Sequence, residues 1–326
     1  GATLEFYQSS APSNSYTKQF ILYGGGATPC ITNWSGGGSS TISGRMTLNG
    51  PCVIGVNGTS FTNNCVIAGA GGLIKGGTRP LVLGAVNTYS GNTTVNGGIL
   101  LLKGNGSISS SANIFITAGA TLDASARNDA TLTLAAAQTI SGNGTLNGNV
   151  VVGDGAALAP GNSIGTLAFD GDLNLNGGST TVMAVDKNAI SSNSVAQVAG
   201  SLTCGGTLLI TNLGSIPFAA GDSFKLFNAS KYNGTFTNIV PAIPGINLAW
   251  DTDGLTNGVL KVVPATTRPP KFAGMTATGN RLVIFGTGGV PDWPYHIVTS
   301  TNLALPPTNW TLFSTDMFNE NGNFIF

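Results

Sequence analysis

The sequence predicts an all-β fold in which a parallel β-solenoid, or β-helix, precedes a small β-sandwich module. Short apolar runs separated by Gly- and Asn-bearing turns recur along most of the chain. Glycine accounts for 48 of 326 residues, as expected for a chain that turns often. Helical signals are nearly absent, because no stretch combines a 3.6-residue apolar period with capping residues. Copies of the strand-turn-strand pattern lie at residues 87–102, 114–122, 150–158, 173–182 and 202–210.

The clearest copy of the repeat lies at residues 87–102. It reads as two short strands, residues 93–95 and 99–102, joined by an Asn-Gly-Gly corner. Each run is too short to form a core alone, so it buries apolar side chains only when successive coils stack. The repeat therefore predicts a solenoid.

Residues 1–30 are expected to form N-terminal strands or a cap, with aromatic-rich strand candidates at residues 3–7 and 16–23. Aromatic strands ahead of the regular coils also predict a segment that pairs with another copy. The strand-like run at residues 323–326 predicts the same, because an open strand edge accepts a further strand. The assembly candidates are Leu4, Phe6, Tyr7, Phe20, Leu22, Tyr23, Phe324 and Phe326.

The β-helix is expected over residues 31–263. Bulkier aromatic residues in 202–263 predict wider terminal coils or a cap over the open end. Residues 264–270 contain three prolines without strand alternation, which predicts a stiff extended linker. Residues 271–326 hold four separated strand candidates with turn signals between them, at the spacing of a small β-sandwich.

Two segments resemble known bacterial repeat families. Residues 87–102 (NTYSGNTTVNGGILLL) resemble the autotransporter-associated β-strand repeat of passenger domains, and this likeness extends over residues 66–263. It implies a right-handed parallel β-helix, secretion and surface display, and it brings no catalytic residues. Residues 286–310 resemble a C-terminal β-sandwich module of secreted repeat proteins, in which one more strand normally follows the position of Phe326.

The charge balance excludes some partners. Only 8% of residues are charged, against about 25% in ordinary proteins, and 13 basic residues balance 13 acidic ones. Without a basic run the chain is not expected to bind nucleic acid. Near-zero net charge permits self-association. No membrane span is expected, because no apolar run approaches about 18 residues, and no export leader is expected at Gly1.

The four cysteines are Cys30, Cys52, Cys65 and Cys204, with no C-x-x-C pair, so a zinc site is not expected. Disulfide bonding in an oxidising compartment is the favoured interpretation, with one bridge among Cys30, Cys52 and Cys65. The shared Cys-Val-Ile pattern at Cys52 and Cys65 suggests equivalent positions on adjacent coils. The alternative is that all four thiols stay reduced in the core.

No catalytic, metal or cofactor site is expected. His296 is the only histidine and has no nucleophile motif beside it. Asp170 and Asp172 form the closest acidic pair, but a turn explains them better than catalysis. The Asp251–Gly254 loop lacks the remaining ligands of a calcium site. The acidic residues of the coils are scattered: Asp123, Asp129, Asp154, Asp170, Asp172, Asp186 and Asp222.

The sequence thus predicts a secreted, extracellular or cell-surface structural protein that is not an enzyme and whose main partner is itself, in a head-to-tail filament or layer. A monomeric surface adhesin or glycan-binding β-helix is the alternative, with Trp293 as the residue for sugar contact. A polysaccharide-degrading β-helix enzyme is the third interpretation.

Overall fold

The structure, a computed structural model, divides into two compact units, each described by itself. The first comprises residues 1–241 and 251–261, and the second residues 242–250 and 262–326. Part of the expected linker 264–270, residues 266–269, lies outside the described residues. The structure describes residues 3–7, 13–25, 28–34, 38–190, 192–246, 248–265, 270–279, 281–290, 293–306 and 309–326.

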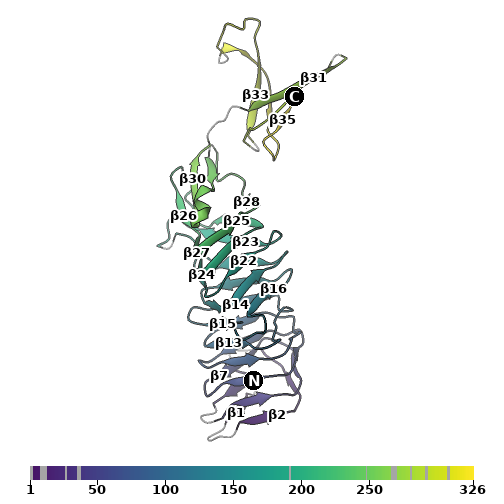
Figure 1. The fold of residues 1–326 in the computed structure, drawn as a ribbon, viewed down its shortest axis with the longest axis vertical. Coiled ribbons are helices and arrows are strands. Elements are labelled where there is room, and N and C mark those ends of the chain that lie inside the picture. Colours follow the sequence, from purple (N-terminus) through teal and green to yellow (C-terminus); the bar gives the residue numbers. More distant parts are fainter. Residues whose placement is uncertain are drawn as a thin grey trace. The chain divides into compact units, whose positions relative to one another are not determined.

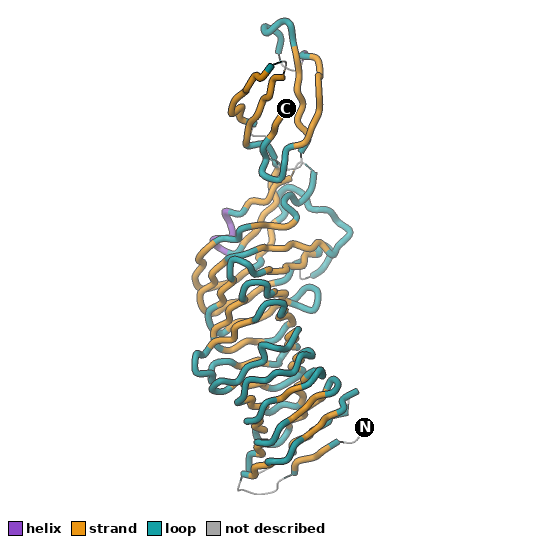
Figure 2. The backbone as a smooth tube through the Cα atoms, turned by 90° about the vertical axis from the view of Figure 1, so that its right-hand side faces the viewer, coloured by secondary structure: helices purple, strands orange, loops and turns teal. Residues whose placement is uncertain are grey.

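The first unit is a parallel β-solenoid of about nine turns, which confirms the predicted fold class. Its strands stack from β1 and β2 at one end to β25 and β28 at the other (Figure 1). Figure 2 shows the strands of successive coils lying over one another, with loops at the corners.

The longest continuous face is an 11-stranded sheet whose neighbours come from successive coils. In order, its strands are β1 Leu4–Phe6, β4 Ile31–Asn33, β7 Cys52–Val56, β10 Leu73–Gly76, β12 Thr93–Val95, β14 Asn113–Ile116, β17 Thr139–Gly142, β20 Ala157–Pro160, β23 Thr180–Val185, β25 Thr207–Asn212 and β28 Asn238–Val240.

The second large sheet has 13 strands and covers two faces. The first half of β24 (Val195–Cys204) pairs with β21 and its second half with β22, so one strand joins both faces. One arm holds β2 Asn14–Tyr16, β5 Ser40–Ile42, β8 Phe61–Asn63, β11 Leu81–Leu83, β13 Ile99–Leu102, β15 Thr121–Asp123, β18 Thr145–Asn147 and β21 Thr166–Phe169. The other holds β16 Thr131–Leu134, β19 Asn149–Val152 and β22 Leu173–Leu175, and β27 Phe227–Gly234 pairs with β24.

The register repeats from coil to coil. Leu73 pairs with Thr93, and Thr93 pairs with Ile114, so one coil uses 20 residues and the next 21. Alternate residues of each strand point inward, and Val95 and Ile116 are fully buried. Stacked inward side chains of this kind form a continuous core along the solenoid axis.

Corners need glycine where coils approach closely. Gly142 has a φ of +115°, and a Cβ there would lie 2.0 Å from the carbonyl oxygen of Ile116 in the preceding coil. Amide ladders link other corners, as where Asn113 donates to Asn92 at 3.0 Å. Turn chemistry thus fixes the coil spacing as well as the chain direction.

The N-terminal strands are the first coil of the solenoid. β1 pairs with β4 and β2 with β5, both in parallel, and β3 (Phe20–Leu22) pairs with β6 (Met46–Leu48). β9 (Ile67–Ala68) continues this third face. Parallel coiling therefore starts at Leu4 in the structure, ahead of the expected start at residue 31, because Phe6 and Leu22 point inward and continue the core.

The opposite end of the solenoid changes character. The last parallel strand is β28, and β26 (Ser223–Lys225) pairs antiparallel with residues 259–261 of β30 (Val259–Pro264). A short 3-10 helix, η1, spans Asp253–Asn257, and β29 spans Leu248–Asp251. Parallel coiling therefore ends before residue 263, where we expected it, and bulkier residues such as Phe224 and Phe227 pack over the core instead.

The second unit contains two small antiparallel sheets, as predicted for residues 271–326. One joins β31 (Lys271–Thr278), β32 (Arg281–Thr287) and β35 (Phe324–Ile325). The other pairs β33 (Pro294–Thr299) with β34 (Thr311–Met317). The four strand candidates correspond to β32, β33, β34 and β35, whereas β31 was not foreseen.

Candidate functional site: exposed strand edges

Among the described residues, the first strand of the first coil, β1, pairs with β4 alone. The backbone N–H of Leu4 donates to the carbonyl of Cys30, and the N–H of Trp34 donates to the carbonyl of Phe6, both at 3.0 Å. In a parallel ladder, alternate residues of a strand bond to the same neighbour. The N–H and C=O of Glu5 therefore point away from β4, toward the end of the solenoid.

The other two strands of this coil repeat the arrangement. Among the described residues, β2 pairs with β5 alone and β3 with β6 alone. Their central residues, Ser15 and Ile21, therefore also direct their backbone N–H and C=O groups outward. Four backbone hydrogen bonds fix this register. The N–H groups of Asn14 and Phe20 donate to the carbonyls of Ser39 and Arg45, and the carbonyls of Tyr16 and Leu22 accept the N–H groups of Ser43 and Asn49.

The structure divides the predicted N-terminal assembly residues into two groups. Phe6 and Leu22 are 6% and 9% exposed, so they belong to the core, and Phe20 is half-buried. Leu4, Tyr7 and Tyr23 lie on the surface, and sequence reasoning missed the exposed Ile21 beside them. The exposed fractions are 40% for Leu4, 72% for Tyr7, 59% for Ile21 and 77% for Tyr23. In the described part of this coil, backbone groups that face away from the solenoid and exposed apolar side chains thus occur together.

The C-terminal module also exposes apolar strands. Its β33–β34 sheet has two strands, and among the described residues neither pairs with a third. On β34 the exposed fractions reach 57% for Leu312, 65% for Phe313 and 53% for Met317. Tyr295 of β33 joins this pair to the other sheet, because its hydroxyl donates to the carbonyl of Ile325 at 3.0 Å.

The two C-terminal assembly candidates are half-buried. Phe326 packs edge-on against Phe313 at 5.8 Å between ring centroids, and Phe324 lies 5.4 Å from Tyr295. Beside these rings is a cavity of about 480 Å³ whose lining includes Met317 and Ile325. Phe324 and Tyr295 therefore line a cavity that is open to solvent at the surface of the module.

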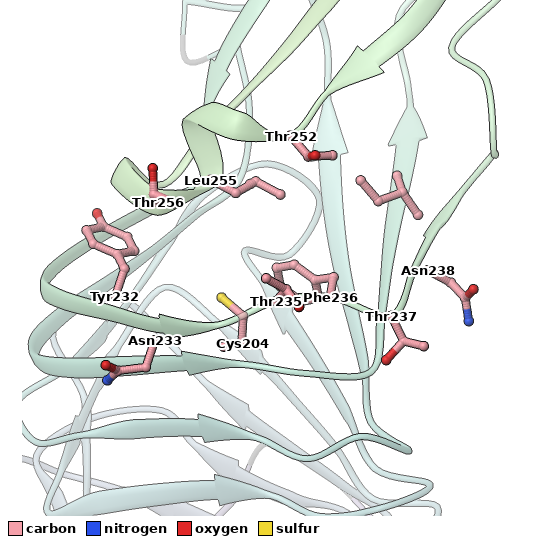
Figure 3. Close-up of a pocket in the computed structure, with 12 residues that line it drawn as sticks. Cys204, Tyr232, Asn233, Thr235, Phe236, Thr237, Asn238, Thr252, Leu255 and Thr256 are labelled. Atoms are coloured by element: carbon pink, nitrogen blue, oxygen red, sulfur yellow. The ribbon is translucent and has the colours of Figure 1, made fainter. Parts of the chain in front are cut away.

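A second cavity, of about 340 Å³, lies at the far end of the solenoid. Cys204, Phe236 and Leu255 lie around its centre, whereas Asn233 and Asn238 point away from it (Figure 3). No side chain in its lining is charged, and burial raises the pKa of Cys204 to about 11. The cavity therefore offers apolar surface and a protonated thiol, with no general base beside it.

The four cysteines are free thiols in the structure. Cys52 begins β7, whereas Cys65 lies between β8 and β9 of the same coil. The expected equivalence of Cys52 and Cys65 on adjacent coils is therefore wrong, because their Cys-Val-Ile patterns fall at two different corners. Cys30 lies next to Cys52, and their side chains interact.

The acidic residues serve turns. The carboxylate of Asp172 accepts the N–H of Ser201 in the next coil at 2.8 Å, and that of Asp154 accepts the N–H of Gly178 at the same distance. His296 is exposed on β33, where its Nδ1 lies 2.8 Å from Thr315 Oγ1. These contacts assemble no acid–base pair.

The tryptophan side chains differ in their exposure to solvent. Trp293, the predicted candidate, is half-buried, and its carbonyl accepts the N–H of Phe318 at 2.9 Å. Trp34, on the second coil, is 51% exposed. Because Phe6 pairs with Asn33, the next residues, Tyr7 and Trp34, are neighbours on successive coils.

The described residues contain neither a metal-binding cluster nor a membrane-spanning helix. No group of three or more His, Cys, Asp or Glu side chains in this part of the chain could hold a metal ion. Within the same residues, no helix has the length and hydrophobicity required to cross a bilayer.

No protein-family model matches this sequence. Over 88 residues, which make up 24% of this chain, it is 39% identical to the adhesin BmaC autotransporter of Brucella suis biovar 1 (strain 1330). This stretch covers 2% of that protein, so the chain spans a very small part of the length of the relative it matches. The chain fits a passenger-type β-helix. The partial match to this adhesin and the observed solenoid together confirm the resemblance to a passenger-type β-helix that residues 87–102 predicted.

Proposed function

We propose that this protein is a secreted, non-enzymatic structural protein of the cell surface, whose copies assemble head to tail through the first coil. The main support is the open edge of that coil, where Glu5, Ser15 and Ile21 direct backbone groups away from the solenoid. Such an edge is a template on which another β-strand can pair.

Exposed apolar side chains on the first coil would also favour association, because a second copy could cover them. Tyr7, Ile21 and Tyr23 are each more than half exposed. Covering apolar surface contributes about 25 cal/mol for each Å² removed from water. Strand pairing at this edge would add backbone hydrogen bonds to that burial, and so join a directional interaction to a hydrophobic one.

The complementary surface is the C-terminal module of a second copy. Its β33–β34 sheet leaves Leu312, Phe313 and Met317 exposed and two strand edges open. A contact between the first coil of one copy and the module of the next uses two different surfaces. Such a heterologous contact propagates as an open fibre unless its rotation closes a ring.

The charge balance is compatible with this contact. Thirteen basic and thirteen acidic residues leave no net charge that would repel a second copy. Glu5 is the acidic residue of the first coil's open strands, and Lys18 lies on the same coil. Desolvation of polar backbone, rather than charge repulsion, is then the main cost of association.

A surface adhesin is the second candidate, and a specific observation favours it. The one curated relative described above is named an adhesin and an autotransporter. The exposed pair Tyr7 and Trp34 on adjacent coils could stack on sugar rings in such a role. A polysaccharide-degrading enzyme is disfavoured because the carboxylates of Asp154 and Asp172 bind backbone N–H groups at turns.

Light scattering and electron microscopy of the purified chain over a range of concentrations test the proposal. The wild type is expected to form filaments, and Ile21→Lys is expected to remain folded and monomeric, because it places a charge beside the open edge. Val86→Lys is the matched control, since Val86 is 52% exposed on the side of the solenoid. A wild-type chain that stays monomeric at high concentration would overturn the assembly proposal and leave the adhesin candidate.

A further inference from the structure

Two cysteines meet at one corner of the N-terminal coils. Cys30 precedes β4, and Cys52 begins β7 on the next coil. The backbone N–H of Cys30 donates to the carbonyl of Val53 at 2.8 Å, which places Cys30 beside the residue that follows Cys52. Because Ile31 pairs with Ile54, Cys52 is the diagonal neighbour of Cys30 on the adjacent strand, and their side chains interact.

We propose that Cys30 and Cys52 form a disulfide that ties the second coil to the third. The bond is independent of the proposed assembly, because it lies within one copy. It would link positions 22 residues apart in the sequence and so close a loop of about one coil.

The packing around Cys52 supports this pairing. Cys52 is fully buried, and its thiol lies 3.5 Å from the carbonyl oxygen of Leu22. A Cβ at Gly24 would lie 2.9 Å from the backbone nitrogen of Cys52, so the first coil passes directly over this corner. Burial and the Cys30 thiol together raise the pKa of Cys52 to about 12. Cys30 is thus the side-chain partner that the fold brings to Cys52.

The other two cysteines are placed differently. Cys65 is half-buried at another corner of the coil, and its thiol donates to Asn63 Oδ1 at 2.9 Å. Cys204 ends β24, far along the stack, where its neighbours are β22 and β27. Neither residue shares a corner with Cys30 or Cys52.

The reaction is a thiol–disulfide exchange with a small or protein disulfide of the oxidising compartment as oxidant. Cys30, the more accessible of the two, attacks as a thiolate, forms a mixed disulfide and releases one thiol of the oxidant. Cys52 then loses its proton and attacks the Cys30 sulfur, which releases the second thiol. Two protein thiols are oxidised, and one disulfide is reduced to two thiols.

Peptide mapping under non-reducing conditions tests the assignment. The full chain is incubated in a buffer of oxidised and reduced glutathione, its remaining thiols are alkylated, and it is digested. We expect one linked peptide pair containing Cys30 and Cys52, with Cys65 and Cys204 alkylated. A bridge to Cys65 or Cys204, or four alkylated thiols after full incubation, would overturn the proposal.

Two variants distinguish the effect of the disulfide on the melting temperature from the effect of side-chain packing at this corner. Cys30→Ser is expected to lower the melting temperature of the oxidised protein to that of the reduced wild type, and reductant should then have no further effect. Cys65→Ser is the matched control and should keep the linked peptide and the response to reductant. A melting temperature of the wild type that does not change with reductant would contradict the bridge.

Discussion

Lys75 donates a hydrogen bond of 2.9 Å to the carbonyl oxygen of Gly97, which lies one coil further along the solenoid. The same ammonium also donates to the carbonyls of Gly76 and Gly77, at 2.7 and 2.9 Å. Lys75 is fully buried, so three backbone acceptors take the place of water around it. A charged group therefore links two coils from inside the core.

Burial lowers the pKa of Lys75 from 10.5 to about 8. Between these values the unfolded chain binds more protons than the folded protein, so stability should rise with pH and be lost again as pH falls through 8. From pH 8 to about 10, the wild type should gain on the order of 2 kcal/mol relative to Lys75→Met. Urea unfolding of both proteins at each pH measures this difference.

Ile74→Val is the control for this prediction, because Ile74 is the neighbouring residue on β10 and carries no titratable group. Its stability difference from the wild type should not change with pH over that interval. A flat difference for Lys75→Met as well would show that burial does not govern the protonation of Lys75.

A buried chain of hydroxyls predicts a cost for removing its central member. Tyr89 and Thr93 are joined at 2.6 Å, and Thr93 donates to Ser111 at 2.9 Å. Thr93→Val should lower the free energy of unfolding by about 1–3 kcal/mol, because it leaves the fully buried Tyr89 hydroxyl without its partner. Thr94→Val, on the outward face of the same strand, should cost much less by chemical denaturation. Equal costs for the two variants would contradict this account.

Two glycines with positive φ allow the energetic cost of backbone strain to be distinguished from the cost of a steric clash between coils. Gly142 has a φ of +115° and would place a Cβ 2.0 Å from the Ile116 carbonyl, whereas Gly119 has a φ of +78° and open space around it. Gly119→Ala should cost about 1 kcal/mol. Gly142→Ala should cost several times more, because the coils would have to move apart. Thermal unfolding of the two variants compares them, and similar melting temperatures would argue against tight contact at this corner.

The proposed assembly should depend little on salt. A contact built from strand pairing and apolar side chains lacks the ion pairs that salt screens, and the chain carries no net charge. Sedimentation of the filament between about 50 mM and about 1 M NaCl should therefore show no loss of polymer. Dissolution at the higher salt concentration would instead indicate that charged groups hold the copies together.

Sequence periodicity was sufficient to predict the regular coils, because their strands bury one face and turn at glycines. It could not predict β31, whose residues are nearly all exposed and therefore lack an apolar pattern. The Cys-Val-Ile pattern misled the comparison of Cys52 with Cys65, because similar runs occur on different faces of a coil. Alternation along β10 places Lys75 on the inward face with Leu73. The sequence could not predict a buried ammonium there, because one of its three acceptors, the carbonyl of Gly97, comes from the next coil.

The unequal coil lengths have a consequence for how such a molecule can vary. Coils take 18 residues from Ile140 to Leu158 and 31 from Thr207 to Asn238, yet strand pairing continues through both. The loops thus absorb insertions while the strands keep their spacing. Duplication or deletion of one coil would change the reach of the solenoid by about 4.8 Å without altering more distant contacts. The distance over which the protein extends can therefore be adjusted gradually by coil number.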